Sequence, residues 1–451
     1  MLIVIDSLRA DKFYGNSKTA VTPNIDLLIK KGVYFTQAVS SADVTGKCLG
    51  NIFTGMYSYK TGINNHKFNS EIRTIFDIVK EHGSSLYAAI PNLTWYKQLE
   101  NKFDKVDRID VLNADKNGLV GDIGDQIIER LQSNKTKQPW FYYIHLGDLR
   151  HKGRVFSHNE IIVPPEFDKR KFGETKYERM LSYVDVWLGK ILNNIDLKNT
   201  VVIITADHAD VIPIESYSNK ISQLEKLLRK IGNNKTWEAK KYFPMLTPIG
   251  KKLFILIERI ITNLKRVRLE KKFTIEQMRT LNARGDKTLY DEKLRVPLLI
   301  IKKGINPNIV NKLVGNIDIF STIIDIFGIK NDDAEIDSKS LLSIIEGKET
   351  RERPMFIESG DNMENEGFVI GIRTSKFKYY RSRTVPDKDV HLYDLQKDPL
   401  EKYNIATSIP EIVESMERIL KSFQIKSTVI ETEKDDNDKK IEKELKKLGY
   451  I

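Results

Sequence analysis

The chain has 451 residues, of which 40% are hydrophobic and 30% charged, which suffices for one large domain and a smaller one. Its single cysteine excludes an intramolecular disulfide framework and a cysteine-rich zinc site. The formal net charge is +11, and residues 211–285 hold this whole excess, with 17 Lys and Arg against 6 Asp and Glu. Such a local basic segment does not indicate a nucleic-acid-binding fold, and we expect no nucleic-acid partner.

No apolar run approaches the roughly 18 residues that a membrane-spanning helix needs. The opening stretch, "MLIVIDSLRAD", turns polar too soon for a signal peptide. We therefore expect a cytoplasmic protein. The chain begins directly inside what reads as a buried strand, and an upstream segment would change that expectation.

Short apolar runs alternate with helical patterns through about the first three quarters of the chain. The runs that predict buried strands are residues 1–6, 85–90, 139–146, 200–207 and 296–301. Residues 22–32 predict a helix, since Thr22 precedes Pro23 and Gly32 follows the last apolar residue. This alternation predicts an α/β fold, a mostly parallel central sheet with helices on both faces. Ligands of such folds bind at the carboxyl ends of the strands.

After about residue 350 apolar and polar residues alternate, as in antiparallel strands with one solvated face. We predict a main α/β domain at residues 1–345, a C-terminal α+β subdomain with a small antiparallel sheet at 346–428, and a charged helix at 429–451. That last helix carries an apolar stripe of Ile441, Leu445 and Leu448.

The basic segment 211–285 is predicted to be a helical insertion in the main domain. Within it, residues 249–272 place apolar side chains at helical spacing, with Lys and Arg largely opposite. A basic amphipathic helix of this kind binds a membrane surface or a polyanion. It can also be a lid whose apolar stripe packs on the core, which is the reading we favour.

The stretch "SSADVTGKCLGNIFTGMYS", residues 40–58, contains a Gly-Lys pair typical of phosphate-binding loops. Such a loop needs a glycine five residues before the pair and Ser or Thr after it. Ser41 and Cys48 occupy those positions, so the spacing excludes a nucleotide loop.

Four polar residues follow predicted strands or precede a predicted helix. Asp6 and the pair Asp207-His208 end strands, and Thr45 precedes a helix-like run. Each alone reads as a helix cap or as surface polarity. Together at one edge of a parallel sheet, two carboxylates and an imidazole suit a divalent cation. A hydroxyl beside that cation can ionise and act as a nucleophile toward an anionic ester.

The segments "LIVIDSLRAD", "TPNIDLLIKKGVYFTQAVSSA", "FTGMYSYKTGI", "TADHAD", "LYDEKLRVPLLI" and "LYDLQKDPLEKYN" occur in this order. In this order they resemble the sulfatase branch of the alkaline phosphatase superfamily over nearly the full chain. The resemblance implies an alkaline-phosphatase-like fold and one divalent metal ion (Ca, Mn, Zn or Mg). It assigns the metal to Asp6, Asp207 and His208, with Thr45 as both nucleophile and ligand.

The resemblance also has departures. In sulfatases the nucleophile is usually Cys or Ser converted to formylglycine in a C/S-x-P-x-R context. Here the context is "TGKCL", without the proline or the arginine, so we expect formylglycine neither at Thr45 nor at Cys48. Ser7 stands where many relatives carry a second Asp.

The remaining catalytic candidates are basic. Arg150 occupies the histidine position of the family's "D-x-H" motif, followed by His151, and Lys287 precedes "TLYDE". With Lys47, these residues are candidates for neutralising the oxyanion or protonating the leaving group. A solvated surface side chain is the competing interpretation for each.

Our leading hypothesis is a metal-dependent hydrolase of sulfate or phosphate esters that uses Thr45 through a covalent intermediate. The substrate would be an anionic ester, for example of a glycan or a glycolipid. One alternative is a transferase that moves a phosphoethanolamine- or phosphoglycerol-type group onto a glycan. The other is a protein that keeps the fold without turnover.

Overall fold

The computed structural model describes residues 1–111, 118–132, 136–150, 161–212, 274–275, 279, 288–330, 335–349, 352–360 and 368–424. The chain divides into two compact units, one of Met1–Lys152, Asn159–Asp210 and Lys287–Ile451, the other of Gly153–His158 and Val211–Asp286. The helices and strands below belong to the first unit. His151, Lys287, the amphipathic segment 249–272 and the predicted helix 429–451 lie outside the described residues.

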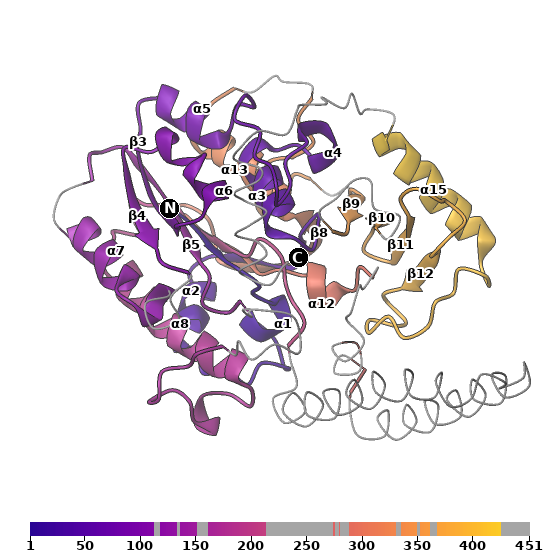
Figure 1. Cartoon of the computed structure of the whole chain (residues 1–451), viewed down its shortest axis with the longest axis horizontal. Coiled ribbons are helices and arrows are strands. Elements are labelled where there is room, and N and C mark those ends of the chain that lie inside the picture. The colour runs from indigo at the N-terminus through magenta and orange to yellow at the C-terminus, as the bar shows by residue number, and fades with distance from the viewer. Residues whose placement is uncertain are drawn as a thin grey trace, which may run out of the picture. The chain divides into compact units, whose positions relative to one another are not determined.

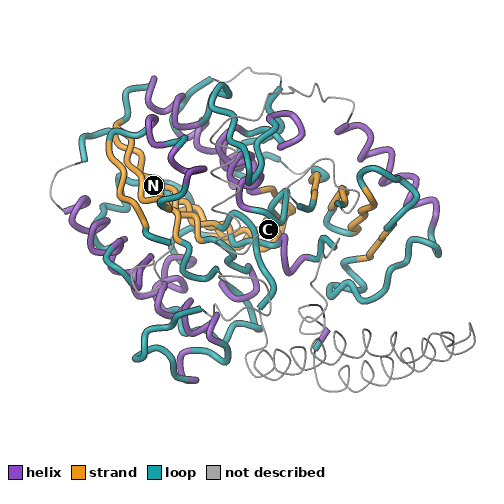
Figure 2. The backbone as a smooth tube through the Cα atoms, viewed as in Figure 1, coloured by secondary structure: helices purple, strands orange, loops and turns teal. Residues whose placement is uncertain are grey.

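Eight of the described strands form one sheet in the order β4-β3-β5-β1-β6-β7-β2-β8. Figure 2 shows the strands in orange with helices around them. The strands are β1 (Leu2–Ile5), β2 (Val33–Val39), β3 (Ser85–Pro91), β4 (Lys105–Ile109), β5 (Trp140–Leu146), β6 (Val202–Thr205), β7 (Leu298–Ile301) and β8 (Asn308–Gly315). Only β7 among them runs antiparallel to its neighbours, β6 and β2. The predicted mostly parallel sheet is confirmed.

Helices cover both faces of this sheet. Figure 1 shows α3, α5 and α13 on one side of the strands and α2, α7 and α8 on the other. The described helices are α1 (Ala10–Phe13), α2 (Pro23–Ile29), α3 (Thr45–Thr54), α4 (Ser58–Thr61), α5 (Ile75–Glu81), α6 (Thr94–Lys97), α7 (Ile123–Gln132), α8 (Lys176–Leu192), α12 (Asp291–Leu294), α13 (Ile319–Ile326), α14 (Leu342–Ile345) and α15 (Pro410–Gln424). The helix predicted at 22–32 is α2.

Local sequence explains where the functionally relevant helices begin and end. Helix α8 starts with a capping box, in which the Thr175 side chain accepts a hydrogen bond from the Glu178 backbone N–H. Helix α3 ends at Gly55, whose φ of 69° is a left-handed conformation that glycine adopts without strain. At the start of α3 the N-cap residue Val44 makes no side-chain cap, and the Gly46 N–H donates to Asn65 Oδ1 instead.

A second sheet confirms the predicted antiparallel C-terminal subdomain. Its order is β12-β11-β10-β9, and its described strands are β9 (Met355–Glu358), β10 (Val369–Arg373), β11 (Phe377–Ser382) and β12 (His391–Asp394). Met416 and Leu420 of α15 pack against Ile370 and Tyr379 of this sheet. The predicted domain boundaries remain predictions. Among the described residues, no helix is both long enough and apolar enough to cross a membrane.

Candidate metal and nucleophile site

The candidate site lies at the carboxyl ends of three neighbouring strands. Strand β1 pairs in parallel with β5 on one side and β6 on the other, so all three end at the same edge of the sheet. Asp6 follows β1, Asp207 follows β6 and His145 lies near the end of β5, and each is at most 2% exposed. Asp6 and Asp207 therefore lie close together, as their positions at the ends of predicted parallel strands indicate.

Ser7 holds both carboxylates. Its backbone N–H donates to Asp207 Oδ1 at 3.3 Å, and its hydroxyl donates to Asp6 Oδ1 at 2.8 Å. Its φ of 64° lies in the left-handed region, where a non-glycine residue is strained by about 1–3 kcal/mol. The Tyr177 hydroxyl holds this conformation by donating to the Ser7 carbonyl at 2.9 Å.

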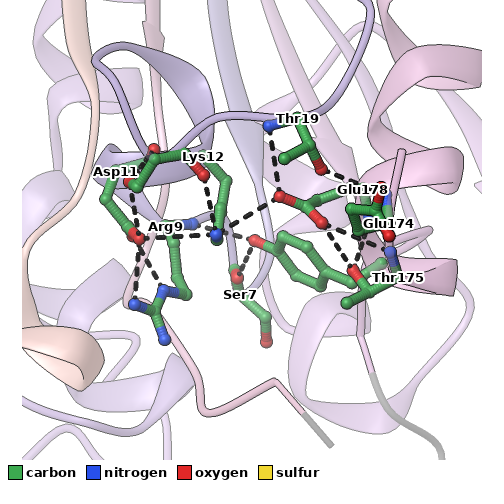
Figure 3. Close-up of polar contacts among 10 residues, drawn as sticks. Ser7, Arg9, Asp11, Lys12, Thr19, Glu174, Thr175 and Glu178 are labelled. Carbon is green, nitrogen blue, oxygen red and sulfur yellow. Dashed lines mark hydrogen bonds and ion pairs between the residues drawn. The ribbon is translucent and has the colours of Figure 1, made fainter. Parts of the chain in front are cut away.

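The loop after Ser7 is tied to the start of α8 by a polar network (Figure 3). The Arg9 guanidinium makes two hydrogen bonds to the Asp11 carboxylate, at 2.8 and 3.0 Å. Lys12 reaches Glu178 at 3.2 Å, and Glu178 also closes the capping box of α8. The backbone that presents Asp6 is therefore anchored to a long helix, which favours a rigid site.

Thr45 is the first residue of α3 and is half-buried. Its Oγ1 lies 3.2 Å from His208 Nε2. The next residue must be a glycine, because the backbone of Asn64 passes close by. A Cβ on Gly46 would lie 2.5 Å from the Asn64 carbonyl. The structure thus places the predicted nucleophile at a helix N-terminus, beside the predicted imidazole ligand.

The His208 ring is oriented through its other nitrogen. Nδ1 lies 2.9 Å from the Ala209 carbonyl, so an N–H on Nδ1 donates there and Nε2 faces Thr45. Nε2 also lies 3.6 Å from Asp207 Oδ2. Burial alone would lower the pKa of His208, but the negative charges of Asp207 and Asp6 raise it to about 9.

The two carboxyl groups have opposite pKa shifts. Burial would raise the pKa of Asp6, but His145 and the charges of Arg150 and His208 hold it well below its usual range. Burial and the negative charge of Asp6 raise the pKa of Asp207. The predicted candidate Arg150 is half-buried, and it lies close enough to Asp6 for its positive charge to lower the pKa of that carboxyl.

The residues present fit a divalent cation. One ligand atom each from Asp6, His145 and Asp207 lies within 4.8 Å of the others. Asp207 Oδ2 is buried and accepts no hydrogen bond from the described residues. A cation would bind this oxygen and would offset the repulsion between the two carboxylates.

His145 is the member of this cluster that the sequence analysis missed. It lies inside the apolar run at 139–146, where a histidine reads as a core residue. Its position next to last in a strand that neighbours β1 is the signal that could have identified it.

Lys47, another predicted candidate, lies in a second buried cluster. Its Nζ forms an ion pair with Glu358 Oε2 at 2.7 Å, and both side chains are at most 2% exposed. Glu358 also accepts hydrogen bonds from Ser58 and Arg383. Cys48 is fully buried and its thiol donates to the Ala42 carbonyl at 3.1 Å. Burial raises the pKa of this thiol well above its usual value.

Comparison with known proteins identifies the family. The Sulfatase family profile matches residues 1–329, and the profile of the N-sulphoglucosamine sulphohydrolase C-terminal region matches residues 285–426. Mouse arylsulfatase K is 32% identical over 146 residues, which are 30% of this chain and 26% of that protein. An N-acetylgalactosamine-6-O-sulfatase of Bacteroides thetaiotaomicron is 23% identical over 326 residues, covering 67% of this chain and 51% of that one. The chain thus spans between about a quarter and half of these relatives.

Solved structures show the same fold. The phosphonate monoester hydrolase of Agrobacterium radiobacter superposes with a TM-score of 0.62 at 18% identity, covering 94% of this chain and 95% of that one. A protein solved in complex with its substrate D-glucosamine-2-N,6-O-disulfate gives 0.61 at 14% identity, covering 94% and 97%. With the profile matches over most of the chain, these likenesses show that the chain belongs to the sulfatase family, in the alkaline phosphatase superfamily.

Proposed function

We propose that the protein is a metal-dependent hydrolase of sulfate or phosphate esters that uses Thr45 as its nucleophile. The observation that supports this most strongly is the 3.2 Å between Thr45 Oγ1 and His208 Nε2, beside the buried Asp6 and Asp207 carboxylates. The Thr45 hydroxyl and the His208 imidazole lie close enough to bind one cation together, which is the arrangement that metal activation of a hydroxyl requires.

In this proposal Asp6, Asp207, His208 and Thr45 hold one divalent cation. When bound, the cation lowers the pKa of the adjacent hydroxyl and draws negative charge toward the site. The remaining contributions come from the protein. The positive end of the α3 dipole favours the anionic oxygens of the ester, and the rigid loop around Ser7 keeps the carboxylates in place.

The reaction proceeds in two displacements. Thr45 Oγ gives up its proton and forms a bond to sulfur or phosphorus, the bond to the leaving alcohol oxygen breaks, and that oxygen takes up a proton. Water then attacks the same sulfur or phosphorus, and Thr45 leaves and regains its hydroxyl proton. Arg150, His151 and Lys287 are the candidates for stabilising the oxyanion or donating to the leaving group.

Thr45 has one hydroxyl, whereas a hydrated formylglycine has two. An unmodified threonine intermediate must therefore be resolved by attack of water, or of another acceptor, on sulfur or phosphorus. Phosphorus and sulfur centres both permit this route, so we leave both ester classes in the proposal.

We further propose a sulfated sugar as the substrate class. A matched relative is named for N-acetylgalactosamine-6-O-sulfate, and a structural neighbour was solved with a glucosamine disulfate. Sulfated saccharides are anionic esters that the predicted site can bind through the N-terminus of α3.

The test is turnover of p-nitrophenyl sulfate and p-nitrophenyl phosphate by the metal-loaded chain, with Thr45→Ala and the matched Thr45→Ser variant. We expect Thr45→Ala to abolish release while metal binding persists, and Thr45→Ser to keep measurable release because it retains a hydroxyl. Bound metal without turnover of either ester or of sulfated sugars would instead indicate a non-catalytic protein.

A further inference from the structure

Ser7 leaves the candidate metal site one carboxylate short of the pattern that many relatives carry. Its neutral hydroxyl already donates to Asp6 Oδ1 at 2.8 Å, so it does not supply a negative ligand. The fully buried carboxylates of the site are Asp6 and Asp207, and the charge of Asp210 also acts on His208. Either another side chain completes the ligand set, or the cation has fewer protein ligands than in those relatives.

His145 lies where such a ligand is needed. Residue Val4 of β1 pairs with His145 in the sheet, which sets the imidazole beside the end of β1. His145 Nε2 is 3.9 Å from Asp6 Oδ2, and the ring is 1% exposed. A separation of 3.9 Å is too long for a hydrogen bond. Two ligands that each lie about 2.1 Å from one ion are up to about 4.2 Å apart, so this spacing suits a shared cation.

Two tyrosines orient the His145 ring. Nδ1 lies 3.0 Å from the Tyr143 hydroxyl and Nε2 lies 3.2 Å from the Tyr96 hydroxyl. The tautomer with N–H on Nδ1 satisfies both contacts, because Nδ1 then donates to Tyr143 and Nε2 accepts from Tyr96. A cation bound to Nε2 would take the lone pair that now accepts from Tyr96, while the donation from Nδ1 to Tyr143 would keep the ring oriented, as is common for metal-binding histidines.

The geometry points to His145 as a metal ligand that takes the place of the second carboxylate. With His208, it gives a site of two imidazoles, two carboxylates and the Thr45 oxygen. Calcium and magnesium take oxygen ligands almost exclusively, whereas imidazole nitrogen suits zinc, copper, iron and nickel. The site therefore selects a transition metal over Ca²⁺ or Mg²⁺. This inference rests on the proposed metal site but not on turnover.

Pulsed EPR of the full chain, stripped of metal and loaded with Mn²⁺, counts the imidazole nitrogens bound to the ion without requiring activity. We expect two imidazoles in the wild type and one in His145→Asn. The matched control His391→Asn changes a histidine in β12, outside the site, and should keep two. A wild-type spectrum with a single imidazole overturns the inference even where the variant does not fold.

Calorimetric titration tests metal selection. We expect the wild type to bind Zn²⁺ and Mn²⁺ more tightly than Ca²⁺, and His145→Asn to weaken Zn²⁺ binding by at least about 10-fold. Adding Ser7→Asp to that variant should raise its Ca²⁺ affinity above that of the wild type, because Asp adopts positive φ more readily than most residues and adds a carboxylate to the site. Ca²⁺ binding as tight as Zn²⁺ binding in the wild type would contradict the inference.

The same preparations separate this inference from the proposed function. Ester release is measured in parallel on the wild type. Two bound imidazoles without release would leave the ligand assignment standing and remove the hydrolase proposal. Ester release with a single bound imidazole would support the hydrolase proposal and remove His145 as a ligand.

Discussion

Two buried clusters of charge meet the first turn of α3, and they differ in how their charges are balanced. In one, Glu358 is surrounded by Lys47, Arg383 and Ser58, so protein groups supply its counter-charge and its hydrogen bonds. In the other, Asp6 and Asp207 lie together, and Asp207 Oδ2 accepts no hydrogen bond from the described residues. We call the first cluster saturated, because protein groups satisfy its buried charges and hydrogen-bonding atoms, and such a cluster stabilises the fold. The second cluster is unsaturated, and such a cluster is suited to bind a ligand.

The phase of the helix explains why neighbouring residues serve different clusters. Thr45 and Lys47 are two residues apart, which is about 200° around an α-helix. Thr45 therefore faces His208 while Lys47 reaches Glu358 at the edge of the small sheet. The first turn of α3 joins the candidate site to the C-terminal subdomain.

Asp207→Asn should show the largest difference between its effect on turnover and its effect on stability. Removing this carboxylate should reduce ester turnover by at least about 10³-fold, since a metal ligand and its charge are lost. The metal-free protein should unfold at the same or a higher temperature, because burial and the charge of Asp6 already disfavour the ionised form. Turnover assays and thermal unfolding with and without chelator measure both effects. Normal turnover in this variant would remove Asp207 from the site.

Lys47→Met should show the opposite pattern. Loss of the ammonium leaves a fully buried carboxylate short of one partner, so the free energy of unfolding should fall by about 3–5 kcal/mol. Metal affinity, measured by calorimetry on the folded variant, should change little. The sequence predicted Lys47 as a catalytic candidate, and a variant with unchanged stability but no turnover would support that role instead.

These two variants also mark what the sequence could and could not predict. Asp6, Asp207 and Thr45 follow from strand-end and helix-start patterns, because those rules place residues at one edge of a parallel sheet. The partner of Lys47 could not be predicted, since Glu358 is 311 positions away and the pairing depends on how the subdomain packs. His145 was missed because an internal strand residue gives the same pattern whether it is core or ligand.

The same limit applies to the strands. Strands with continuous apolar runs, such as β1, β5 and β6, were predicted because both faces are buried. Strands β2, β4 and β8 were not predicted. Strands β4 and β8 lie at the two edges of the sheet and carry exposed polar residues such as Lys105 and Asn308. Strand β2 lies inside the sheet, but the partly exposed Thr36 and Gln37 interrupt its apolar run. Edge position is a tertiary property that the local pattern does not contain.

Acid should weaken the saturated cluster. Burial would raise the pKa of Glu358, but the charges of Lys47 and Arg383 lower it to about 2 from an ordinary 4.5. A lowered folded pKa adds stability above pH 4.5 that is lost as the pH falls toward 2, about 3 kcal/mol in total. Urea unfolding between pH 6 and 3 should show this loss, with a shallower pH dependence in Glu358→Gln. Equal slopes in the two proteins would exclude Glu358 as its source.

Gly46→Ala should give a smaller effect that reaches both clusters. A Cβ here would lie 2.5 Å from the Asn64 carbonyl, so the start of α3 must shift. We expect a loss of about 1–3 kcal/mol in unfolding free energy, together with reduced turnover because Thr45 moves relative to His208. Gly62→Ala provides a control for turnover only, since a Cβ there meets no atom within 4 Å but its φ of 68° makes alanine strained, so this variant also loses stability without displacing Thr45. A stability loss without a turnover change would show that the site tolerates the shift.

The most direct test of the central claim is mass spectrometry of the peptide that contains Thr45 and Cys48, taken after rapid acid quench of the metal-loaded protein during turnover. The account predicts unmodified residues before substrate is added and a sulfo or phospho group on Thr45 after it, absent in Thr45→Ala. Formylglycine in this peptide, or undiminished turnover in Thr45→Ala, would contradict it.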